Sequence, residues 1–113
     1  MPMFMISMNW TDQAIRAIKE ARQRAQYGRE LGKKFGVEYK ALYMTSGDSD
    51  LVAIVEAPNG DAVAKFVLAL SSRGNVRTRT KRAWPEAEYL KLISELPKRL
   101  EARGNLGGRT AKT

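Results

Sequence analysis

The sequence predicts an α+β protein with a ferredoxin-like fold, in which helices cover one face of a four-stranded antiparallel sheet. Four segments have the apolar or alternating pattern of strands, at residues 2–9, 37–45, 50–57 and 75–84. Amphipathic helical patterns follow the first, third and fourth of these segments. The resulting order, β-α-β-β-α-β-α, is that of a split βαβ arrangement with an extra C-terminal helix, and 113 residues suffice for one such domain.

The first strand is apolar on both faces, which predicts a central position in the sheet. One face carries Met3, Met5 and Ser7, and the other carries Phe4, Ile6 and Met8. Thr11 is placed to cap the helix that follows, whose outer face is basic. We expect Gly28 to bend or split this helix and Gly36 to end it in a left-handed conformation.

The second and third strands are predicted to form a hairpin. Residues 37–45 alternate with one partly polar face, as an edge strand does, whereas residues 50–57 are apolar on both faces and predict a central strand. Between them, the letters SGDS are typical of a tight turn. Asn59 is then placed to cap a second helix whose apolar stripe is Ala62, Val63, Phe66, Val67 and Leu70.

The fourth strand is predicted to lie at the other edge of the sheet, because Val76, Thr78 and Thr80 alternate with Arg77, Arg79 and Lys81. Pro85 opens the last helix, which carries Tyr89, Leu92, Ile93 and Leu96 on one face. We therefore expect one domain over residues 1–96. Residues 97–113 are basic and rich in glycine, which predicts a disordered tail.

The composition excludes several kinds of chemistry. The chain has no cysteine and no histidine, which removes disulfides, iron–sulfur clusters, thiol nucleophiles and the commonest general base and metal ligand. We predict no metal site and no cofactor, so any catalysis would depend on carboxylates, lysine, tyrosine, a hydroxyl group or the substrate. The apolar start of the chain is too short to span a bilayer and lacks a basic leader, which predicts a soluble cytoplasmic protein without membrane contact.

The net charge of +8 raises the question of nucleic-acid binding. Residues 11–36 carry seven basic and three acidic side chains and residues 97–113 carry five and one, while residues 37–96 are balanced at eight of each. RNA-recognition modules share this element order but stack bases on aromatic residues of their central strands. The third strand has no aromatic residue, so we expect no specific nucleic-acid binding; weak, salt-sensitive binding through the basic tail stays open.

The second face of the sheet needs cover, because its methionines would otherwise form an exposed apolar patch. A second copy of the chain is the simplest cover. Two sheets packed face to face form a dimeric α/β barrel, whose interior can hold a small ligand. The predicted partner is therefore the chain itself, in a homodimer or higher oligomer.

Three motifs in order resemble the GYD-domain family: NWTDQAI after the first strand, SGDSDLVAIVEAP across the hairpin, and ALSSRGNVRTRTKRAWPEAEY over the fourth strand. The resemblance covers nearly all of residues 2–96. Gly47 and Asp50 match the glycine and aspartate that give the family its name, whereas Ser49 stands in place of the tyrosine. The resemblance implies a dimeric α/β barrel-like fold and a small, soluble bacterial protein of uncharacterised function, and it supplies no catalytic residues.

The candidate ligand-binding residues are Asn9, Tyr43, Asp50 and Arg77, which we expect near the mouth of the barrel pocket. Asp48 and Asp50 fit either a carboxylate pair for acid–base chemistry or the caps of a tight turn. The cations on the fourth strand fit either an anion site, for a small anionic or organic ligand, or a solvated edge. The sequence thus favours a small ligand-binding protein, and it leaves open an enzyme of the cofactor-free monooxygenase or isomerase type.

Overall fold

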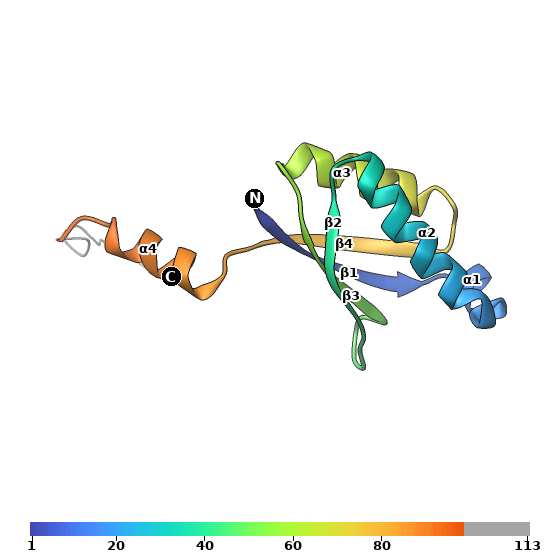
Figure 1. Cartoon of the computed structure of the whole chain (residues 1–113). Coiled ribbons are helices and arrows are strands. Elements are labelled where there is room, and N and C mark those ends of the chain that lie inside the picture. The colour runs from blue at the N-terminus through green and yellow to red at the C-terminus, as the bar shows by residue number, and fades with distance from the viewer. Residues whose placement is uncertain (99–113) are drawn as a thin grey trace. The chain divides into compact units, whose positions relative to one another are not determined.

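The computed structural model describes residues 1–98, which form two compact units (Figure 1). The first unit is Met1–Ala83, and the second begins at Trp84. Residues 99–113, which hold nearly all of the predicted tail, lie outside the described residues. The first unit contains the sheet and the helices that pack on it.

The sheet has the predicted topology. Its strands are β1 (Met3–Trp10), β2 (Glu38–Met44), β3 (Leu51–Glu56) and β4 (Val76–Ala83), in the order β2-β3-β1-β4. All three neighbouring pairs are antiparallel. The two strands that are apolar on both faces are therefore central, and the two alternating strands lie at the edges, as the sequence predicts.

The helices of the first unit are α1 (Asp12–Arg16), α2 (Ala21–Lys34) and α3 (Gly60–Ser71), with a short 3-10 turn, η1 (Ile18–Glu20), between the first two. Both predicted caps are confirmed: the Thr11 side chain accepts a hydrogen bond from the amide of Ala14, and the Asn59 side chain accepts one from Ala62. Each cap satisfies a backbone amide that has no partner within its own helix.

The prediction that Gly28 bends or splits the first helix is wrong. The break lies at Ala17, where φ is −118°, and Gly28 is buried inside α2. Arg24 stabilises the break, because its guanidinium donates hydrogen bonds to the carbonyl oxygens of Ala14 and Ala17 at 3.3 and 2.9 Å. The same two carbonyl oxygens also accept backbone hydrogen bonds, from the amides of Ala17 and Glu20 respectively, so Arg24 adds a second donor to each.

The core lies between the helices and one face of the sheet (Figure 1). The buried strand residues are Phe4, Ile6, Met8, Ala53 and Val55, and α3 contributes Val63, Phe66 and Leu70. The apolar stripe predicted for α3 thus packs on the alternate residues of the two central strands. The opposite face of the sheet receives no helix from this unit.

Glycines with positive φ lie at turns, and two of them are at the predicted positions of the first helix end and the hairpin. Gly36 has φ of 76° and follows α2, as the sequence predicts, and Gly47 has φ of 94° in the β2–β3 hairpin. Non-glycine residues rarely adopt this conformation because their Cβ atoms clash with the backbone.

In the second unit, Pro85 directly precedes helix α4 (Glu86–Ser94) as its N-cap residue. Large apolar side chains of this unit are exposed, namely Trp84, Tyr89, Leu90, Leu92, Ile93 and Leu96. Across residues 1–98, we find no helix with the length and apolar content needed to span a membrane.

Candidate functional site

The β2–β3 hairpin is tied to the central strand through Asp50. A carboxylate oxygen of Asp50 accepts a hydrogen bond from the Trp10 amide at 2.9 Å, and the Asp50 amide donates to the carbonyl oxygen of Met8 at 2.9 Å. Within the hairpin, the Thr45 amide donates to the Asp50 carbonyl at 2.9 Å. Asp50 therefore joins the end of β1 to both sides of the turn.

Three of the four predicted site residues come together at this end of the sheet. Asn9 is the cross-strand neighbour of Arg77, and its side-chain amide donates to the carbonyl oxygen of Asp48 at 2.8 Å. Asp50 lies beside them through its bond to Trp10. Tyr43 is 59% exposed and lies on β2, which β3 separates from β1. The structure therefore separates Tyr43 from Asn9 and Arg77 by the width of β3, whereas Asp50 lies next to β2 through its bond with Thr45.

Ser49, which stands where the family motif has a tyrosine, also joins this network. Its hydroxyl oxygen accepts a hydrogen bond from the guanidinium of Arg79 at 3.0 Å. Its carbonyl oxygen accepts a bond from the Thr45 hydroxyl at 2.6 Å. The turn is thus linked to β4 as well as to β1, and the sequence patterns contain no signal for these partners.

We expect Asp50→Asn to lower the free energy of unfolding by about 1–2 kcal/mol, because it replaces a charge-assisted hydrogen bond to the Trp10 amide by a neutral one. The measurement is urea unfolding at fixed protein concentration. Asp48→Asn is the matched control, because the carboxylate of Asp48 makes no hydrogen bond to residues 1–98 and the substitution should change stability little. Equal stability of the two variants would show that the Asp50 carboxylate is not structural.

The open face of the sheet, defined as the face that α1–α3 leave uncovered, has an apolar centre. The strand register places Met5 between Ile54 and Lys81, and Ser7 between Val52 and Arg79. The open face therefore consists of the following residues: Met3, Met5, Ser7, Asn9, Ala41, Tyr43, Val52, Ile54, Arg77, Arg79 and Lys81, with Glu38 and Glu56 at one corner. Cations border the apolar centre along β4.

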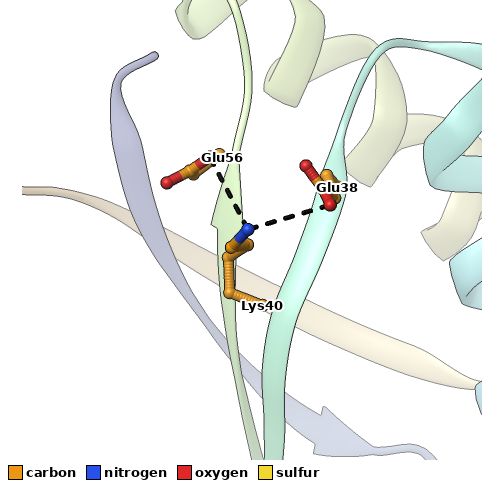
Figure 2. A network of polar contacts seen from close by, with 3 residues as sticks. All are labelled: Glu38, Lys40 and Glu56. Atoms are coloured by element: carbon orange, nitrogen blue, oxygen red, sulfur yellow. Dashed lines mark ion pairs between the residues drawn. The ribbon is translucent and has the colours of Figure 1, made fainter.

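The corner of the open face on β2 and β3 carries the opposite charge. The ammonium group of Lys40 lies 3.8 Å from a carboxylate oxygen of Glu38 and 4.0 Å from one of Glu56 (Figure 2). Two carboxylates share one ammonium group, so this cluster has a net charge of −1. The open face is therefore positive along β4 and negative at the β2 side.

A cavity of about 590 Å³ lies on the other face of the sheet, between it and the helices. Its apolar walls include Met8, Leu51, Leu70 and Val76, and Arg24 and Arg73 are among its polar lining residues. Tyr39 also lines it, and burial raises the pKa of its hydroxyl to about 12 although the nearby Arg29 lowers it. This cavity is distinct from the pocket that the sequence predicts between two sheets.

The model of the GYD domain family matches residues 4–93. The chain belongs to this family. A relative from Thermus thermophilus, the glutamine synthetase and cystathionine β-lyase binding protein, is 35% identical over 91 residues, which are 80% of this chain and 96% of the relative.

Solved structures share the fold at low identity. A feast or famine regulatory protein from M. tuberculosis, complexed with L-methionine, superposes with a TM-score of 0.57 and 16% identity over 75% of this chain. This chain spans about half of that regulator, 51% of its length. A crystal structure of a protein from Thermus thermophilus gives a TM-score of 0.50 and 21% identity over 75% of this chain and 95% of its own. These similarities confirm the ferredoxin-like fold.

Proposed function

We propose that this protein works by binding: two copies associate through the open face, and the pair binds a metabolic enzyme. The open face supports the association of two copies, because an apolar sheet face that its own helices leave uncovered is typical of an interface. The Thermus relative supports the second part, because its name states that it binds glutamine synthetase and cystathionine β-lyase and the match spans 96% of it.

The charges of the open face favour a second copy as its cover. If a two-fold axis runs parallel to the strands and between the two sheets, β4 of each copy lies over β2 of the other. The cations of β4 then face the side of the sheet that carries Glu38 and Glu56. An axis perpendicular to the strands in the same plane would place β4 over β4 and bring like charges together. The first arrangement is therefore the one we propose.

The space between two such sheets is also the place for the ligand site that the sequence predicts. Asn9 and Arg77 are cross-strand neighbours on the open face, and an amide beside a guanidinium suits an anionic group. Asp50 positions them by holding the end of β1. In the proposed arrangement, β2 of the second copy lies over β4 of the first. Tyr43 of the second copy would then lie near Arg77 and Asn9 of the first copy. We retain these four residues as a proposed site for a small anionic or organic ligand.

The enzyme-binding part is tested by surface plasmon resonance with glutamine synthetase and cystathionine β-lyase from the source organism. We expect a dissociation constant of about 10 μM or tighter for at least one of them at physiological salt, the range of specific transient complexes. An unrelated acidic enzyme is the control, because a chain of net charge +8 attracts acidic proteins without specificity. Equal binding to the acidic control, or binding to neither enzyme, would refute this part.

A further inference from the structure

The cavity on the helix-covered face has the features of a ligand site of its own. Its volume of about 590 Å³ lies within the roughly 300–1,000 Å³ of small-molecule pockets. Its walls come from the ends of β1, β3 and β4 and from α2. Ala17, at the break between α1 and the longer helix, also lines it. A cavity of this kind binds the apolar part of a ligand through the hydrophobic effect.

Arg73 gives the cavity a cation with available hydrogen-bond donors. Its guanidinium carbon lies 4.2 Å from the centroid of the Tyr27 ring, so the ring holds the side chain in place. Its backbone is also held, because its carbonyl oxygen accepts a hydrogen bond from the Gln13 side chain at 3.1 Å. Within residues 1–98, none of its guanidinium N–H groups donates a hydrogen bond.

Arg24 also lines the cavity but differs from Arg73 in its bonding. The two terminal nitrogens of Arg24 donate to the carbonyl oxygens of Ala14 and Ala17, so this side chain holds the helix break. A guanidinium that is fixed in place and has unused donors is suited to a bidentate contact with a carboxylate. Arg73 is exposed, it is oriented by stacking on the Tyr27 ring, and none of its guanidinium donors bonds to residues 1–98.

We propose that this cavity binds a small organic carboxylate with an apolar body, whose carboxylate is held by Arg73. The apolar body lies against the walls formed by Met8, Leu51 and Leu70. This site goes beyond the proposed function, because it lies on the opposite face of the sheet and needs neither the second copy nor the enzyme. The two proposals can therefore fail independently.

Octanoate is the probe, and octan-1-ol is its neutral counterpart with the same apolar chain. Trp10 lines the cavity and reports binding by its fluorescence once the second tryptophan is removed by Trp84→Phe. We expect octanoate to bind at least about tenfold more tightly than octan-1-ol, because only octanoate makes a charge-assisted contact with Arg73. Equal affinities, or no change in Trp10 fluorescence with octanoate, would overturn the proposal.

Three variants in this background locate the site. Arg73→Gln should weaken octanoate at least about tenfold and leave octan-1-ol unchanged. Ala25→Leu, which adds volume to the lining of the cavity, should weaken both probes, and a thermal melt checks that it folds. Lys65→Gln removes the same charge from an exposed position on α3 outside the cavity and should change neither affinity. Unchanged octanoate affinity in Arg73→Gln, or an equal loss in Lys65→Gln, would refute the assignment to this cavity.

Discussion

Gly32→Val should lower the free energy of unfolding by about 3 kcal/mol, one of the largest effects we expect from a single substitution. A Cβ atom on Gly32 would lie 2.7 Å from the backbone carbonyl oxygen of Val37, far inside van der Waals contact. The same two residues are joined by a hydrogen bond from the Val37 amide to the Gly32 carbonyl at 2.8 Å. Val37 is 1% exposed, so the turn cannot move away without disturbing the core.

Thermal and urea unfolding at one protein concentration measure this effect, which should lower the melting temperature by roughly 12 °C or more. Gly60→Val is the matched control. Gly60 is also a helical glycine, but a Cβ atom there meets no atom within 4 Å, so the cost should stay below about 1 kcal/mol. Similar losses in the two variants would show that helix propensity, and not the close approach to Val37, decides the result.

Local chemistry explains why much of the fold could be predicted. Thr11, Asn59 and Gly36 act within a few residues of their own positions, as two caps and a left-handed turn, so the sequence beside them suffices. The alternation in β1 likewise shows which residues face the helices, because side chains of a strand point to opposite faces in turn. The position of each strand also follows, because the two strands that are apolar on both faces are central and the two alternating strands lie at the edges.

The role of the glycines in α2 depends on distant residues, and the sequence therefore misses it. Gly28 is predicted to bend the helix, but it allows α2 to lie close to the sheet: a Cβ atom there would lie 3.1 Å from the Tyr39 hydroxyl oxygen. The actual break at Ala17 has no glycine or proline to mark it. Arg24, seven residues after Ala17, donates hydrogen bonds to carbonyl oxygens at the break, and no local pattern marks this contact. The cavity beside the break could not be predicted for the same reason.

The sequence predicts part of the candidate site. The pattern around Asp50 predicts a turn, but the amide that its carboxylate binds belongs to Trp10, 40 residues earlier. The alternation of β2 predicts which face of the sheet Tyr43 lies on, but it does not predict the distance between Tyr43 and Asn9. In the structure, β3 lies between the strands of these two residues. No sequence motif marks Arg73, because its stacking partner Tyr27 lies on another helix, α2, and not beside it in the chain.

Ile54→Asp should weaken self-association at least about 100-fold. Ile54 lies on the central strand β3, between Met5 and Ala41 in the register of the open face. In the proposed pair this position is covered by the second sheet, so each copy would bury an unpaired carboxylate. Leu68→Asp is the matched control, because Leu68 is 72% exposed on α3 and the same change there should leave self-association intact.

Sedimentation velocity over a range of concentrations tests the central claim, that the open face binds a second copy of this chain. We expect the wild type and Leu68→Asp to sediment at micromolar concentration as a species of at least twice the chain mass of 12.7 kDa, and Ile54→Asp to sediment as a folded monomer. A wild type that stays monomeric at every concentration, or a folded Ile54→Asp variant that associates as the wild type does, would contradict the claim.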